Sequence, residues 1–154
     1  MLSSQLIVAL LLSTLMLPLL SANTFDISED TTWSGNITLD SDVVVVSGST
    51  LTIEPGTVID GGYGHAIEVL GTLIVADAHF LSSASPTAQS SHGQGLWQGI
   101  IVNAGGHATL TNVTIENANV GVKSYGSLFA NELTVTDAYF CLLYTSPSPR
   151  DAES

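Results

Sequence analysis

The stretch that decides the fold is Thr50-Leu-Thr-Ile-Glu-Pro-Gly-Thr-Val58, in which apolar and polar residues alternate before a Glu-Pro-Gly turn. The pattern returns in three later segments: Thr72-Leu-Ile-Val-Ala-Asp-Ala-His-Phe80, His107-Ala-Thr-Leu-Thr-Asn-Val-Thr-Ile115 and Ser127-Leu-Phe-Ala-Asn-Glu-Leu-Thr-Val135. Successive copies start 22, 35 and 20 residues apart. Such a repeat is typical of a solenoid, in which each copy packs only against its neighbours.

Aligning the four segments gives columns of equivalent residues. Three apolar columns are predicted to face inward: Leu51, Leu73, Ala108 and Leu128; Ile53, Val75, Leu110 and Ala130; and Val58, Phe80, Ile115 and Val135. Two columns are predicted to face outward: Thr52, Ile74, Thr109 and Phe129; and Thr57, His79, Thr114 and Thr134. This alternation has the period of two that indicates a β-strand with one buried face.

Each segment also contains a polar corner and follows another short apolar run. The corners fall at Glu54-Pro55, Ala76-Asp77, Thr111-Asn112 and Asn131-Glu132. The preceding runs are residues 66–69, 100–102 and 120–122, and Phe140 aligns with Val120 and Ile100. Three short strands and three corners per turn predict an all-β protein, a right-handed parallel β-helix of about four to five coils.

The domain boundaries follow from departures from this repeat. The β-helix is predicted over residues 23–140, and residues 31–49, which precede the clean repeat, are expected to form a capping coil. Residues 82–96 account for the long interval and are expected to form one long loop, because they are rich in Ser, Gly and Gln.

The N-terminus predicts a secreted or cell-surface protein. Residues 6–20 form a nearly unbroken apolar run, followed by the small residues Ser21 and Ala22. About twenty apolar residues are needed to span a bilayer, whereas a signal-peptide core needs about 7–15. Residues 1–22 are therefore expected to be a cleaved signal peptide, with an uncleaved membrane anchor as the alternative.

The last residues, 141–154, change character abruptly. They hold two of the five prolines and one of the two basic residues, and the stretch from Cys141 to Asp151 resembles one reading frame of an adapter used in transposase-based DNA sequencing libraries. We therefore expect a non-native tail after Phe140 and an N-terminal fragment of a longer protein. A genuine Pro-rich linker is the alternative.

The repeat resembles the secreted parallel β-helix proteins of the pectin-lyase-like superfamily. The resemblance rests on Leu51-Thr-Ile-Glu-Pro-Gly-Thr57 and Trp97-Gln-Gly-Ile-Ile-Val102, and it covers roughly residues 31–140. It implies the fold more strongly than an activity, because the superfamily includes polysaccharide lyases, polygalacturonases, adhesins and proteins without known activity.

The charge balance excludes nucleic acid as a partner. The chain has a formal net charge of −12, with 14 acidic residues and only two basic ones, Lys123 and Arg150. Nucleic-acid binding depends on Lys and Arg neutralising phosphates. Membrane contact is expected only through an uncleaved N-terminal segment, because no basic patch is present for anionic lipids.

No convergent catalytic group is evident in the sequence. Lyases of the superfamily typically use Arg or Lys as the base, and Lys123 lacks neighbouring cations that would bind an acidic substrate. The carboxylates lie at or near corners, where Asp and Glu are interpreted as turn residues, with weak calcium sites as the alternative. The four histidines lack metal-ligand spacing. We therefore predict no catalytic, cofactor-binding or metal-binding residue.

The candidate ligand contacts are Trp97, Tyr63 and Phe129, because loops and exposed side chains on rigid solenoids carry function. Two functions remain open at this point. The first is a non-catalytic scaffold, adhesin or glycan-contacting module, whose partners are extracellular polysaccharide or other surface proteins. The alternative is an N-terminal fragment of a polysaccharide lyase or glycoside hydrolase, with catalytic coils beyond residue 140.

Overall fold

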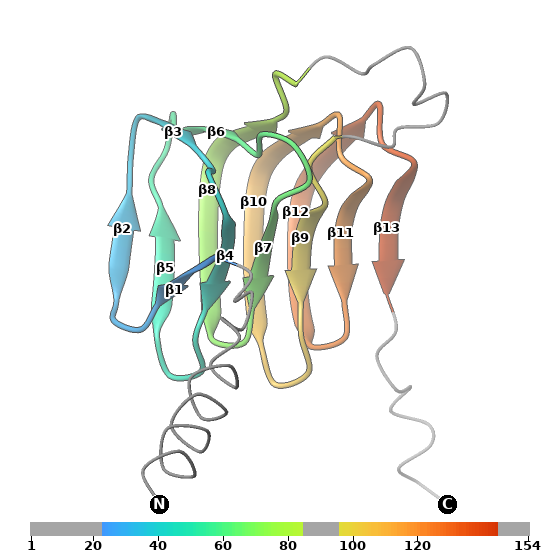
Figure 1. The fold of residues 1–154 in the computed structure, drawn as a ribbon. Coiled ribbons are helices and arrows are strands. Elements are labelled where there is room, and N and C mark those ends of the chain that lie inside the picture. The colour runs from blue at the N-terminus through green and yellow to red at the C-terminus, as the bar shows by residue number, and fades with distance from the viewer. Residues whose placement is uncertain (1–22, 85–95, 145–154) are drawn as a thin grey trace, which may run out of the picture.

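The computed structural model describes residues 23–84 and 96–144, and these residues form thirteen β-strands and no helix (Figure 1). The strands are β1 (Thr24–Ile27), β2 (Thr31–Trp33), β3 (Asn36–Thr38), β4 (Asp42–Val45), β5 (Thr50–Ile53), β6 (Val58–Asp60), β7 (Ala66–Val69), β8 (Thr72–Leu81), β9 (Gly99–Val102), β10 (His107–Glu116), β11 (Val120–Ser124), β12 (Ser127–Thr136) and β13 (Phe140–Tyr144). No helix in this part of the chain is long and apolar enough to cross a membrane.

The strands form two parallel sheets that the chain visits in turn. The first sheet has the order β1-β4-β7-β9-β11-β13. The second sheet has the order β12-β10-β8-β5-β2, with β3 and β6 extending it beside β8. Because each strand pairs with its counterpart one turn later, the chain is a parallel β-helix of about five coils, as the sequence predicts.

Three strands per coil are clearest in the first two coils. There the second sheet receives two short strands, β2 with β3 and then β5 with β6. In the next three coils the two are joined into one strand of ten residues, β8, β10 and β12. Each long strand bends at one residue with positive φ: Asp77, Asn112 or Glu132. The polar corners predicted from the sequence lie at these bends.

The register of the sheets confirms most of the predicted columns. Leu51, Leu73, Ala108 and Leu128 are partners in adjacent strands, and so are Ile53, Val75, Leu110 and Ala130. The outward column of Thr52, Ile74, Thr109 and Phe129 is also in register. The inward columns form one continuous apolar core, in which each fully buried aliphatic side chain contributes roughly 1.5–3 kcal/mol.

The third inward column was assigned one residue too early in the first segment. The partner of Phe80 is Ile59, which is completely buried, while Val58 pairs with His79 and is half-buried. Val58 therefore takes the outward place predicted for Thr57. The reason is the corner: four residues separate Ile53 from Val58, but only three separate Val75 from His79. The longer corner contains Pro55 and turns at Gly56, whose φ is 81°.

The first and last described coils also refine the boundaries. The solenoid begins with β1, which pairs with β4 and lies inside the predicted β-helix of residues 23–140, ahead of the residues expected to form the capping coil, 31–49. Phe140 pairs with Val120 as predicted, but Ile100 pairs with Val122. The backbone of residues 141–144, which are predicted to belong to the non-native tail, continues β13 beside β11, and their non-native origin stays a prediction. Residues 1–22, 85–95 and 145–154, which include the predicted signal peptide, lie outside the described residues.

Close approach of neighbouring coils requires glycine at one corner. Gly71 follows β7, and a Cβ placed there would lie 2.3 Å from the carbonyl oxygen of Val46 in the preceding coil. The amide of Gly71 donates to the carbonyl oxygen of Val45 at 2.9 Å. Any side chain at this position would force the two coils apart.

Candidate functional site

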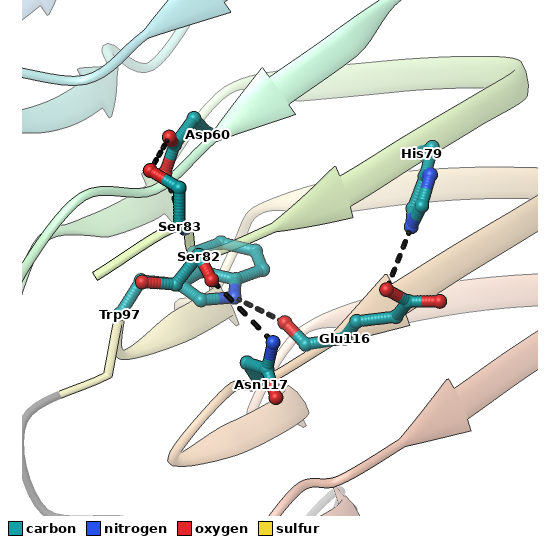
Figure 2. A network of polar contacts seen from close by, with 7 residues as sticks. All are labelled: Asp60, His79, Ser82, Ser83, Trp97, Glu116 and Asn117. Atoms are coloured by element: carbon teal, nitrogen blue, oxygen red, sulfur yellow. Dashed lines mark hydrogen bonds and ion pairs between the residues drawn. The ribbon is translucent and has the colours of Figure 1, made fainter. Parts of the chain in front are cut away.

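Trp97 is a core residue. Its side chain is 0% exposed, and its ring stacks on Phe80 with centroids 5.9 Å apart and planes 8° from parallel. The indole nitrogen donates to the carbonyl oxygen of Glu116 at 3.1 Å, as Figure 2 shows. A Cβ at Gly61 would lie 2.4 Å from the indole ring, so that glycine makes room for it. The side chain of Trp97 therefore has no exposed surface in this structure, and its contact with a ligand stays a prediction.

Tyr63 and Phe129 are exposed, but they do not share a surface. Tyr63 is 66% exposed in the turn between β6 and β7, and Phe129 is 62% exposed on the outer face of β12. The strands β6, β8, β10 and β12 follow one another in the second sheet, which places the two residues three coils apart. At about 4.8 Å per coil, that separation is roughly 14 Å along the axis alone.

The base of the segment between β8 and β9 is held by Asp60 (Figure 2). Its carboxylate accepts hydrogen bonds from the amide of Gly62 at 2.9 Å, from the amide of Ser83 at 3.1 Å and from the Ser83 hydroxyl. Burial opposes the charged form of Asp60, but these hydrogen bonds outweigh burial and lower the pKa of its carboxyl group. The Ser82 hydroxyl adds a hydrogen bond to the carbonyl oxygen of Gly62 at 2.6 Å.

A shallow groove with both polar and apolar lining crosses the outer face of the second sheet, where β6, β8 and β10 lie side by side. Its volume is about 480 Å³. We define the groove by the residues that line it: Val58, Asp77, His79, Asn112, Thr114 and Glu116, together with Gly56, Thr57 and Ala78. Because the strands are parallel and in register, His79 lies directly beside Val58 on one side and Thr114 on the other.

Two close polar pairs lie in the groove. The amide of Asn112 donates to Asp77 Oδ1 at 2.6 Å, which links the bend of β10 to the bend of β8. His79 Nε2 lies 3.3 Å from Glu116 Oε2, as Figure 2 shows. The two atoms are close enough for an ion pair, but their geometry is not that of a hydrogen bond. His79 Nε2 is shielded from solvent and has no hydrogen-bond partner among the described residues.

The two carboxylates of the groove belong to positions that lie far apart along the sheet. The backbone position of Asp77 lies beside Asn112, and Glu116 follows four residues later along the same strand. At about 3.3 Å per residue this separation is roughly 13 Å. Carboxyl groups that hydrolyse a glycosidic bond stand about 5–9.5 Å apart. The backbone positions of the two carboxylates are therefore farther apart than the paired carboxyl groups of a glycosidase.

Sequence reasoning missed this groove, although it located its residues. The prediction aligned His79 with Thr114 and Thr134, which the register confirms, and interpreted Asp77 and Glu116 as separate turn residues. The contact that the alignment does not reveal runs diagonally across the sheet, between His79 and Glu116. Glu116 lies two positions beyond Thr114, the partner of His79, and diagonal neighbours in a sheet are within reach of long side chains.

A second hollow, of about 330 Å³, lies in the first coil and is mainly apolar. It is lined by Phe25, Trp33, Ile37, Leu39 and Val43, together with Thr38, Asp40 and Ser41. Apart from Phe25, the apolar side chains are buried or half-buried and pack on or belong to the continuous core. This hollow is therefore an opening over the apolar core at the first coil.

The other ionisable side chains of the described residues do not gather at one place. No group of three or more His, Cys, Asp or Glu side chains gathers as a metal site in the described part of the chain. Lys123 belongs to β11 of the first sheet, and its ammonium lies 4.9 Å from the centre of the Tyr125 ring. That geometry is a cation–π contact between neighbouring side chains.

Comparisons with protein-family models, with curated proteins and with solved structures found no match. Functional inference therefore rests on the fold and on the groove.

Proposed function

We propose that this chain is a non-catalytic secreted or cell-surface β-helix protein that contacts extracellular polysaccharide through the outer face of its second sheet. The observation that carries the proposal is the groove across β6, β8 and β10, which exposes amide, imidazole, hydroxyl and carboxylate groups on a rigid framework. The apolar run at residues 6–20 supports export of the chain.

The repeating geometry of the sheet favours an extended polymer as the ligand. Equivalent backbone positions recur at every coil, about 4.8 Å apart, because the strands are in register, and in the groove they present the different side chains of Val58, His79 and Thr114. A polysaccharide also presents the same hydroxyl groups repeatedly.

The strands that form the groove are preorganised by contacts within the protein. Asp77 and Asn112 are held by their mutual hydrogen bond, and the strands beneath them are anchored by buried residues such as Val75, Phe80 and Ile115. Rigid preorganisation of this kind reduces the entropy cost of binding.

Affinity electrophoresis of the full chain through gels containing neutral, basic or acidic polysaccharides tests the proposal, with calcium added or chelated. We expect at least one polysaccharide to retard the chain and His79→Ala to weaken the retardation. Thr52→Ala, a change on the same sheet outside the groove, is expected to leave it unchanged. Failure of every polysaccharide to retard the chain would contradict glycan contact and leave a scaffold role.

A further inference from the structure

We propose that the groove selects a glycan that carries free amino groups, such as a polymer of unacetylated amino sugars. This inference rests on the proposed function, because it names the class of glycan that the same face would bind. Three features of the groove carry it: its charge, the unused oxygens of its carboxylates and the neutral groups between them.

The charge of the groove is negative. Asp77 lies near one edge and Glu116 near the other, and no Lys or Arg lines the space between them. Among the described residues Lys123 is the only Lys or Arg, and it belongs to the first sheet. A ligand with carboxylates, such as a polyuronate, would therefore meet like charges, whereas a ligand with ammonium groups would meet opposite charges.

One oxygen of each carboxylate is available to accept a hydrogen bond from a ligand. Asp77 uses Oδ1 to accept from Asn112, and Glu116 places Oε2 near His79. Neither Asp77 Oδ2 nor Glu116 Oε1 has a hydrogen-bond partner among the described residues. Hydrogen bonds between an ammonium group and a carboxylate are shorter and roughly twice as strong as those between neutral groups. These two oxygens are the predicted amine contacts.

The neutral groups between the carboxylates suit the rest of a sugar. The Asn112 side-chain oxygen and the Thr114 hydroxyl lie on the same strand as Glu116, and both groups hydrogen-bond to hydroxyls. Val58 supplies an apolar wall on β6, which lies on the other side of β8. A small inorganic cation or a simple polyamine would leave these groups without a partner, so an amino sugar uses more of the groove.

Titration calorimetry of the full chain tests the inference with three oligosaccharides of equal length: oligomers of glucosamine, of N-acetylglucosamine and of galacturonic acid. The first two differ only in the amino group. We expect the glucosamine oligomer to bind about tenfold more tightly than its acetylated counterpart. We expect no binding of the galacturonic acid oligomer, and weaker binding of the glucosamine oligomer at high salt.

Substitutions locate the site. Asp77→Asn and Glu116→Gln remove one charge each while keeping a similar shape, and Asn tolerates positive φ, so the bend of β8 is preserved. Each is expected to weaken binding of the glucosamine oligomer by about fivefold to tenfold. Asp26→Asn makes the same change of net charge on exposed β1, outside the groove, and is expected to leave binding unchanged.

The outcomes separate the inference from the proposed function. Equal affinity for the glucosamine and N-acetylglucosamine oligomers would overturn the role of the amino group and leave glycan contact standing. An equal loss of binding in Asp26→Asn and Asp77→Asn would show an effect of net charge and overturn the groove as the site. If gels of every polysaccharide also fail to retard the chain, the proposed function itself is wrong.

Discussion

At the scale of single residues, Trp97 and Phe129 show how similar side chains take opposite roles. Both are large aromatic residues in a chain with few of them, and the sequence marks both as candidate contacts. The structure buries Trp97 against Phe80 and Gly61 and leaves Phe129 on the surface. Burial of the ring contributes to folding, whereas an exposed ring contributes little to it.

Their substitution by alanine is expected to separate these roles. Trp97→Ala removes a fully buried ring and leaves a cavity, so it should lower the free energy of unfolding by about 3–5 kcal/mol. Phe129→Ala should change it by less than about 0.5 kcal/mol, because the side chain is 62% exposed. Denaturant unfolding followed by circular dichroism measures both. Similar losses in the two variants would contradict the burial of Trp97.

Asp60 is expected to make stability depend on pH. Because hydrogen bonds lower its pKa in the folded chain, ionised Asp60 stabilises the fold above the unfolded-state pKa of about 3.9. That contribution disappears as the pH falls through the lowered pKa. Asp60→Asn should therefore cost less than about 1 kcal/mol at pH 7, because solvent screens the partly exposed carboxylate, and the difference from the parent chain should shrink below about pH 4.

Thermal unfolding across this pH range, compared with Asp26→Asn, measures the effect. Asp26 is exposed and forms no hydrogen bond through its carboxylate among the described residues, so its substitution controls for the change in net charge. A cost of Asp60→Asn that stays constant down to pH 3 would show that the hydrogen bonds do not depend on the charge of Asp60.

At the scale of elements, the bends of the second sheet depend on residues that tolerate positive φ. The corner uses Gly56 in the second coil, then Asp77, Asn112 and Glu132 in the next three. Gly, Asn and Asp adopt this conformation at low cost, whereas glutamate has no comparable preference. Glu132, with φ of 57°, is therefore the strained member of the column.

Replacing Glu132 by asparagine should stabilise the chain. Asn relieves the backbone strain and matches Asn112 in the neighbouring coil, so we expect a gain of about 0.5–1 kcal/mol. Glu132→Ala removes the same charge without relieving the strain, so it should give no gain. Differential scanning calorimetry of the two variants measures this contrast, and an equal rise in Tm for both would attribute the effect to charge.

The comparison of sequence with structure is also clearest at this scale. Alternation of apolar and polar residues predicts the inward columns, because every strand has one face in the core. It does not predict how many residues a corner consumes, and the extra residue between Ile53 and Val58 shifted the third column by one. The His79–Glu116 contact joins positions that are not equivalent in the repeat, so no column reveals it. Trp97 was missed as a core residue because it follows a long insertion that breaks the repeat.

At the scale of the whole molecule, stability comes from stacking. Every described strand pairs with strands of neighbouring coils, and the inward columns run through the stack as one core. A coil of about twenty residues loses roughly 1–2 kcal/mol of backbone entropy per residue on ordering, which its own buried side chains do not offset. Each coil therefore folds only against its neighbours, and damage to one coil must affect the coils beside it.

Leu110 provides the test of this coupling. It is completely buried in β10, between Val75 of β8 and Ala130 of β12. Leu110→Ala should cost about 2–5 kcal/mol and should speed amide hydrogen exchange in β8 and β12 as well as in β10. Because coupling in a solenoid passes from neighbour to neighbour, the increase should be smaller in β1 and β4, which belong to distant coils.

Thr109→Ala changes an exposed residue of the same strand and should leave exchange unchanged. An equal increase in exchange at β1 and β12 would show instead that the coils unfold as a single cooperative unit, and an increase confined to β10 would show that stacking does not couple them.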